Sequence, residues 1–265
     1  MTFRKPREGV ATIPAVKTRS IPSLDKALAV LEMLADARDG MTLPAIAEAL
    51  EAPKSSVHCI LLTLERRGYL VRAEGSRKYS ISLQLVSLAG RALRGLAFQE
   101  QATPHLYWLS RATNCASHLA VLDQSEAVLI AKVEPPGSFR LATWVGRRME
   151  LHCTALGKVL MAALPDEELD MLLNQRSLSR HNQHTITSPR RLREEVDLVR
   201  SQGYSEDDEE DEIGLRCFAA PVVDASGATS AAISISGTTV HVNNDSREQF
   251  VAKLKEAAAR ISAAF

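Results

Sequence analysis

Small and polar side chains gather at three short segments in the second half of the chain, in a pattern suited to binding a small anion. Residues 151–158, LHCTALGK, are predicted to pass from a strand into a helix that begins near Ala155. The N–H groups at the start of a helix are unpaired and attract carboxylates. Ser234 and Ser236 lie two positions apart on a predicted strand, so their hydroxyls share a face. Cys217, on a neighbouring predicted strand, is expected to line the same cavity.

An acidic run precedes Cys217. Residues 206–212, EDDEEDE, are predicted to form a solvated loop, of which one carboxylate could turn inward.

A catalytic alternative would use Cys217 or Cys153 as the nucleophile and His152 as the base. Neighbouring residues on a strand point to opposite faces, so His152 and Cys153 are badly placed to act together. The chain has no GxSxG, HExxH, P-loop or GxGxxG motif. We therefore predict that the protein is not an enzyme. The cysteines lack CxxC or CxxH spacing, which disfavours a zinc knuckle and predicts free thiols; they are Cys59, Cys115, Cys153 and Cys217. We predict no metal site.

The composition is that of an ordinary globular chain with two compact units. It has 265 residues, of which 45% are hydrophobic and 24% charged. The basic start, MTFRKPREGV, leads into no apolar segment, and no apolar run approaches the roughly 18 residues of a membrane span. We expect neither a secretory signal nor a membrane segment, and hence a cytoplasmic location.

The charge is unevenly distributed along the chain. Residues 1–94 hold 15 Lys and Arg against 9 Asp and Glu, whereas residues 95–265 hold 17 against 23. Clustered cations neutralise phosphates, so the first part of the chain suits a nucleic acid.

Residues 21–82 have the order helix, helix, helix, hairpin. The first helix is predicted from Ser23, as its N-cap, to near residues 39–40; Thr42 caps a second; residues 54–67 form a third, which Gly68 ends. Alternating residues in 69–72 and 77–81 predict a hairpin. This order is typical of a winged helix-turn-helix, whose third helix enters the major groove of DNA. The predicted DNA contacts are Lys54, Ser55, Ser56 and His58 on the third helix, and Arg72, Arg77 and Lys78 on the hairpin.

The rest of the chain predicts an α+β fold. An apolar stripe along residues 83–97 indicates a linker helix. Strands are expected at 118–122, 128–133, 139–145, 216–223 and 230–236, and helices at 103–112, 155–164, 166–173, 189–202 and 246–264. Such a mixture favours an antiparallel sheet with packed helices.

Several of these stretches resemble IclR-type transcriptional regulators. In the first part they are IPSLDKALAVLEML, LPAIAEALEAPKSSVHCILLTLERRGYLVR and KYSISLQLVSLAG. In the second they are LHCTALGKVLMAALP, GYSEDDEEDEIGLRCFAAPVVDASG and AAISISG. Cys59 stands where the family often has an arginine. Residues 1–20 are basic and lack helical or strand periodicity, which predicts a disordered arm. The resemblance implies a DNA-binding domain over 21–82, a linker and dimerisation helix over 83–97, and a GAF-like effector-binding domain over 98–265.

The resemblance also implies a function. It is closest to members that sense small oxo acids such as glyoxylate and pyruvate. These members hold the acid with two backbone amides at a helix N-terminus and with the side chains of an aspartate, a cysteine and two serines. These positions fall at Ala155 and Leu156 for the amides and at Asp207, Cys217, Ser234 and Ser236 for the side chains. The expected protein is a homodimeric or homotetrameric repressor that binds a palindromic operator, responds to a small carboxylate and needs no cofactor. The alternatives are an activator of a catabolic operon responding to an aromatic or sugar acid, a cysteine-dependent metabolic enzyme, and an adaptor that uses its helix-turn-helix for protein contacts.

Overall fold

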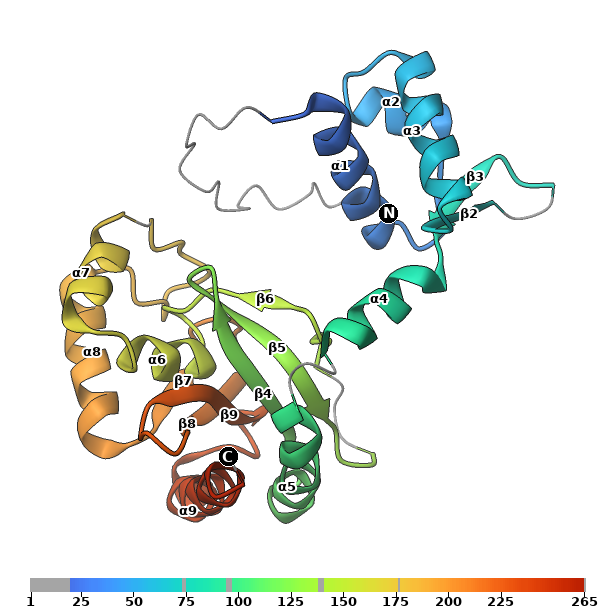
Figure 1. Ribbon diagram of the computed structural model, residues 1–265. Coiled ribbons are helices and arrows are strands. Elements are labelled where there is room, and N and C mark those ends of the chain that lie inside the picture. Colours follow the sequence, from blue (N-terminus) through green and yellow to red (C-terminus); the bar gives the residue numbers. More distant parts are fainter. Residues whose placement is uncertain (1–19, 73–74, 94–96, 138–140, 176, 265) are drawn as a thin grey trace. The chain divides into compact units, whose positions relative to one another are not determined.

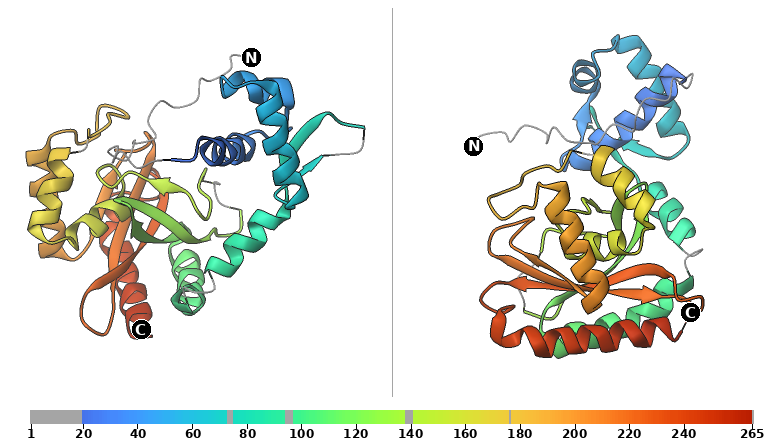
Figure 2. Two further views of the ribbon diagram at one scale, coloured as in Figure 1. Left: turned by 45° about the horizontal axis from the view of Figure 1, so that its top comes forward. Right: turned by 90° about the vertical axis from the view of Figure 1, so that its left-hand side faces the viewer.

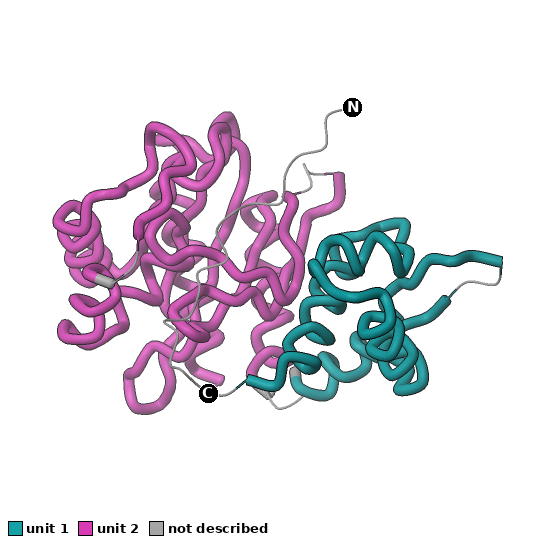
Figure 3. Tube along the Cα trace, turned by 90° about the horizontal axis from the view of Figure 1, so that it is seen from above, with its two compact units in different colours: residues 1–92 teal, residues 93–265 magenta. Residues whose placement is uncertain are grey.

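The chain forms two compact units. The computed structural model describes residues 20–72, 75–93, 97–137, 141–175 and 177–264. The units are Met1–Ala92 and Leu93–Phe265 (Figure 3). The arm predicted over residues 1–20 lies outside the described residues except for Ser20. Within the described part of the chain, no helix is both long enough and apolar enough to span a membrane.

The first unit is a winged helix-turn-helix, as predicted. Its strands form an antiparallel sheet in the order β1-β3-β2. Val30, Ile46, Val57 and Leu61 are fully buried between the three helices and Tyr79 of the sheet. The elements are α1 (Pro22–Asp36), β1 (Met41–Thr42), α2 (Leu43–Ala49), α3 (Lys54–Arg66), β2 (Leu70–Arg72) and β3 (Lys78–Ile81) (Figure 1).

The bounds of the first helix differ from the prediction. Ile21, and not Ser23, occupies the N-cap position of α1, because Pro22 fits the first helical position, where no N–H partner is needed. The helix ends at Asp36 rather than near residues 39–40. The predicted positions of Thr42, as N-cap of α2, and Gly68, with φ +80° after α3, are confirmed.

The linker helix is α4 (Leu83–Leu93), and much of its apolar surface is exposed. The exposed fractions of Leu83, Val86 and Leu88 are 82%, 65% and 42%. Residues 94–96 of the predicted helix lie outside the described residues.

The second unit is built on a six-stranded antiparallel sheet in the order β6-β5-β4-β9-β8-β7. This arrangement confirms the predicted α+β class. The strands are β4 (Ala116–Asp123), β5 (Glu126–Val133), β6 (Arg148–Met149), β7 (Ser205–Asp208), β8 (Leu215–Val223) and β9 (Thr229–Thr238). The helices are α5 (Ala97–Thr113), α6 (Ala155–Ala162), α7 (Asp166–Gln175), α8 (Pro189–Gln202) and α9 (Asn244–Ser262).

Helices cover both faces of this sheet (Figures 1 and 2). On one face, α5 and α9 pack on large side chains such as Phe218, Ile233 and Ile235. On the other face, α6, α7 and α8 pack on smaller ones such as Ala219 and Ala232. Because side chains alternate along a strand, the neighbours of Ile233 and Ile235 on β9 point towards the second face. Ser234 and Ser236 therefore lie on the same side of the sheet as α6.

The predictions for residues 139–145 and for the acidic run differ from the structure. The strand expected at 139–145 is absent over its described part, Leu141–Val145, because Lys132 Nζ donates to the carbonyls of Leu141 and Thr143 (both 2.9 Å) in place of a strand partner. Residues 138–140 lie outside the described residues. The acidic run is not a solvated loop throughout, because its first three residues belong to β7, which pairs with β8.

Candidate effector pocket and DNA-binding surface

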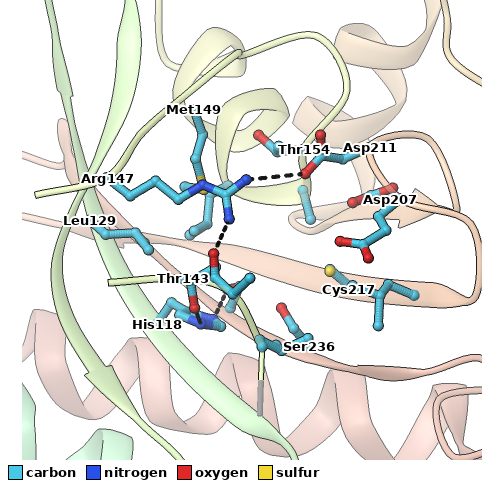
Figure 4. Close-up of a pocket in the computed structure, with 17 residues that line it drawn as sticks. His118, Leu129, Thr143, Arg147, Met149, Thr154, Asp207, Asp211, Cys217 and Ser236 are labelled. Carbon is cyan, nitrogen blue, oxygen red and sulfur yellow. Dashed lines mark hydrogen bonds and ion pairs between the residues drawn. The ribbon is translucent and has the colours of Figure 1, made fainter. Parts of the chain in front are cut away.

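A cavity opens in the second unit between the sheet and the start of α6. Its volume is about 60 Å³, well above the roughly 10–15 Å³ that a cavity needs to hold a single water. All six residues predicted for the effector line it, and Figure 4 shows Asp207, Cys217 and Ser236 on one side of it. The lining residues are His118, Leu129, Leu141, Ala142, Thr143, Arg147, Met149, Thr154, Ala155, Leu156, Asp207, Asp211, Glu212, Leu215, Cys217, Ser234 and Ser236.

Strand register brings the predicted side chains into one row. Asp207 on β7 is directly opposite Cys217 on β8, and Cys217 is directly opposite Ser236 on β9. Directly opposite residues of antiparallel strands project from the same face. The row therefore presents a carboxyl, a thiol and a hydroxyl to the cavity side by side.

The first turn of α6 supplies backbone donors. Thr154 is the N-cap, and its Oγ1 accepts a hydrogen bond from the Gly157 N–H (3.1 Å). The N–H groups of Ala155 and Leu156 have no acceptor within the helix, as at every helix start. A Cβ on Gly157 would lie 2.3 Å from Leu151 Cα, so only glycine lets this turn approach so closely. The turn thus offers two N–H groups to an anion at the cavity wall.

Asp207 is the buried acid of the row. Its side chain accepts a hydrogen bond from the Glu210 N–H (2.8 Å), and its exposed fraction is 4%. Burial, reinforced by the charge of Glu210, raises the pKa of Asp207 to about 7. Near neutral pH this carboxyl can therefore donate a hydrogen bond to a bound carboxylate, which an ionised aspartate cannot do.

Among the polar residues of the cavity, sequence reasoning missed His118, Thr143 and Arg147 entirely. His118 lies directly opposite Ser234, with its Nδ1 3.4 Å from the Ser234 hydroxyl and its Nε2 3.1 Å from that of Thr143. Burial, together with the charge of Lys132, lowers the pKa of His118 to about 3, so its ring is neutral. The Arg147 guanidinium lies 4.0 Å from Asp211 and is the cation of the lining (Figure 4). These residues could not be predicted from local sequence patterns, because some lie in a loop and others reach the cavity only through the pairing of strands that are distant in the sequence.

A buried lysine ties α6 to the acidic run. Lys158 Nζ donates to Glu195 on α8 (3.1 Å), to Glu210 (2.5 Å) and to the Glu206 carbonyl (2.8 Å). Burial alone would lower the pKa of Lys158, but the charges of Glu210 and Glu195 outweigh it and raise the pKa above its ordinary value. This charged contact fixes Asp207 and Glu210 relative to the first turns of α6.

The predicted DNA contacts are all exposed in the first unit. Lys54, Ser55, Ser56 and His58 lie on the first turns of α3. Arg72 also holds the hairpin together, because its Nε donates to the Ser76 carbonyl (3.0 Å) and its guanidinium lies over the Tyr79 ring. Arg77 and Lys78 follow the turn of the hairpin, where a wing meets DNA backbone in proteins of this fold.

The thiols do not form a catalytic site. All four cysteines are free, as predicted. Residues 151–154 form bends and not a strand, so the predicted reason for separating His152 from Cys153 was wrong. The thiols are nonetheless poor nucleophiles, because burial raises the pKa of both Cys153 and Cys217 well above the ordinary value.

Comparison with protein families gives two matches that cover most of the chain. The model for the bacterial transcriptional regulator IclR C-terminal domain matches residues 90–263. The model for the IclR helix-turn-helix domain matches residues 23–74.

Individual relatives and solved structures agree with these matches. The chain is 37% identical over 243 residues to the HTH-type transcriptional regulator KdgR of Dickeya chrysanthemi, covering 92% of this chain and 79% of the relative. It is 31% identical to the transcriptional repressor IclR of Escherichia coli K12, covering 99% and 95%. A crystal structure of a regulator from Rhodococcus sp. RHA1 matches with a TM-score of 0.82, 30% identity and coverage of 92% and 98%. An IclR homologue from Microbacterium hydrocarbonoxydans, crystallised with 4-hydroxybenzoate, has the same fold, with a TM-score of 0.80, 24% identity and coverage of 91% and 98%.

Proposed function

The chain belongs to the IclR family of DNA-binding transcriptional regulators, which are not enzymes, and on this premise we propose that it is a repressor released from its operator by a small carboxylate. The observation that carries the proposal is the meeting of the α6 amides with the Asp207, Cys217 and Ser236 row at one cavity. Two N–H groups, a hydroxyl and a protonated carboxyl can together surround both oxygens of a carboxylate.

The effector class follows from the shape and polarity of the cavity. A site of buried donors discriminates strongly against ligands that leave its hydrogen bonds unmade. A 2-oxo acid fits this wall, because the carboxylate faces the α6 amides while its oxo oxygen accepts from Ser234 or from neutral His118. The small volume of the cavity favours such a ligand over a long chain.

A larger carboxylate is the second candidate. The wall away from the row is apolar, with Leu129, Leu141 and Met149 in the lining. A two- or three-carbon acid would leave these side chains uncovered, whereas an aromatic or sugar acid would cover them. The relative crystallised with 4-hydroxybenzoate supports this class, in which case the regulator could also act as an activator of a catabolic operon.

The DNA side of the proposal requires two copies of the chain. Two winged helix-turn-helix units bind a palindromic operator with one α3 in each major groove. We assign pairing to the exposed apolar surface of α4, which supports a homodimer or a pair of dimers. An effector that prefers one arrangement of the two copies shifts operator affinity by a coupling of about 1 to 3 kcal/mol, or about 5- to 150-fold.

The test combines ligand binding with operator binding. Small 2-oxo acids and aromatic and sugar acids are screened by thermal shift on the full-length protein, and hits are added to a gel shift with the upstream region of its own gene. We expect a hit to raise the Tm and weaken the DNA complex. The double variant Ser236→Ala with Cys217→Ala should lose both responses and still bind the operator.

The matched control is Ser177→Ala, an exposed serine of the same unit outside the cavity lining, which should keep both responses. A double variant that responds normally would refute the pocket assignment. A wild-type protein that binds no duplex at low salt would refute the regulator itself.

A further inference from the structure

A second group of polar side chains lies beside the start of α6 and outside the effector cavity. Glu150, His152 and Cys153 immediately precede the Thr154 N-cap, and His181 comes from the connection between α7 and α8. One possible ligand atom from each of the four residues lies within 4.8 Å of the others. None of the four lines the effector cavity.

The types of these side chains suit zinc. Zinc in structural sites takes four tetrahedral ligands from thiolate, imidazole and carboxylate groups. Bond lengths of about 2.0–2.3 Å place the ligand atoms about 3.3–3.8 Å apart, so the group, whose atoms lie within 4.8 Å of one another, needs to close by about 1.5 Å at most. Soft thiolate and imidazole donors disfavour magnesium and calcium, which prefer oxygen.

The surroundings prepare two of the ligands. His152 is buried, and its Nε2 lies 2.9 Å from the Ser179 carbonyl, to which it can donate as an N–H. With Nε2 carrying the proton, Nδ1 has a free lone pair for a metal ion, and the hydrogen bond fixes the orientation of the ring. This is the usual arrangement around a zinc-bound histidine. His181 Nε2 and Glu150 Oε2 lie 2.5 Å apart and contact each other directly, so the two groups are already neighbours and need to separate by only about 0.8 Å to bind one ion.

The charges of the group match a divalent ion. Cys153 releases its proton to the solvent when the ion binds, so its thiolate and the Glu150 carboxylate together carry two negative charges, and the two imidazoles are neutral as ligands. The complex is therefore neutral overall, which suits a site where Cys153 and His152 are buried. His181 is exposed and leaves a path by which an ion can enter.

We propose that Glu150, His152, Cys153 and His181 form a structural zinc site that fastens the α7–α8 connection to the start of α6. The same connection reaches the acidic run, because Asn182 Nδ2 donates to the Glu209 carbonyl (2.8 Å) and Thr185 Oγ1 to that of Glu210 (2.8 Å). A bound ion thus stabilises the segment that carries Asp207 without touching the effector.

The test uses the full-length protein stripped with a chelator and dialysed. Elemental analysis after refilling with zinc should give one ion per chain. Zinc at a hundredfold excess over its dissociation constant should raise the Tm by about 5 to 10 °C. Cobalt(II) should give the visible absorption of a tetrahedral ion and the ultraviolet charge-transfer band of a cobalt–thiolate bond.

Variants separate this site from loose binding elsewhere. Cys153→Ser should abolish the charge-transfer band, and His181→Ala should weaken zinc binding at least a hundredfold. His184→Ala, which removes an exposed histidine three residues along the same connection, is the control and should bind as the wild type does. A cobalt spectrum without the charge-transfer band, or equal zinc affinity in the His181 and His184 variants, would overturn the proposal.

Discussion

Asp207 shows how a position within the sheet raises the pKa of a single side chain. Next to Glu210, and paired across to Cys217, its carboxyl is shielded from water, and burial raises its pKa from 3.8 to about 7. An acid with a raised pKa binds its proton more tightly in the folded state than in the unfolded state. Its contribution to stability is complete below about pH 4 and declines as the pH rises towards 7.

The first prediction concerns this decline. Between pH 5 and pH 7 the ionisation of Asp207 should cost about 2 to 3 kcal/mol, at about 1.4 kcal/mol per pKa unit. Asp207→Asn cannot ionise, so the Tm of this variant minus the wild-type Tm should rise by about 5 to 10 °C between pH 5 and pH 8. Scanning calorimetry at both pH values measures it. Asp36→Asn, at the exposed end of α1, is the control, and a pH-independent difference for Asp207→Asn contradicts the prediction.

Residues could be predicted where their position depends on neighbours in the sequence, and could not where it depends on contacts between distant parts of the chain. Ser234 and Ser236 could be placed on one face because strand alternation is a local property. His118 could not be predicted, because it meets Ser234 only through the pairing of β4 with β9, 116 residues apart in the chain. His181 likewise joins Glu150 through tertiary folding, and spacing rules for cysteine ligands do not detect such a pair.

Among the elements, α6 depends on one glycine, because Gly157 packs against the main chain of Leu151. Gly157→Ala should push the first turn of α6 outward, since a backbone cannot rotate aside as a side chain does. We expect a loss of about 1 to 3 kcal/mol in the free energy of unfolding, measured by denaturant titration.

Gly157→Ala should also abolish the ligand-induced Tm rise, because the Ala155 and Leu156 amides move. Gly90→Ala is the control, since a Cβ on this α4 glycine meets nothing within 4 Å. It should leave stability equal or slightly higher. Unchanged ligand binding in Gly157→Ala would argue against the role of the amides.

The hairpin and α3 should differ in their effect on DNA binding. Arg77→Ala should weaken binding to all duplexes about equally and lower the slope of log affinity against log salt by about 1, because a wing cation neutralises a phosphate. His58→Ala should instead reduce the preference for the operator over other DNA. Fluorescence anisotropy over a salt series measures both, with exposed Arg190→Ala of the second unit as the control. A loss confined to one operator sequence would show that Arg77 reads bases.

Predictions from sequence succeeded for elements with strong local signals. Helix α8 was predicted with its bounds because Ser188 caps it and Gly203, with φ +73°, ends it. The strand expected at 139–145 failed because Lys132 satisfies the carbonyls of Leu141 and Thr143 from outside the segment. Strand β7 was missed because acidic residues are poor strand formers, and its stability comes from β8 and Lys158.

At the scale of the whole molecule, the proposed dimer predicts that a charge on the apolar surface of α4 weakens subunit pairing. Leu88→Glu places a charge in the exposed apolar stripe, and we expect it to shift the protein towards monomer and lower operator affinity at least tenfold. Sedimentation and gel shift measure the two effects. Ser177→Glu adds the same charge at an exposed serine outside α4 and should leave the assembly intact. A dimeric Leu88→Glu protein would place the subunit contact elsewhere.

In the second unit, the residues that line the cavity and the residues of the main apolar core lie on opposite faces of the sheet. Large apolar side chains lie on the α5 and α9 face, whereas the cavity and its small residues lie on the α6 face. Substitutions that retune the cavity for a new metabolite therefore leave the packing against α5 and α9 largely intact. Gene duplication followed by drift in a few cavity residues could then produce sensors for different nutrients from one ancestral scaffold.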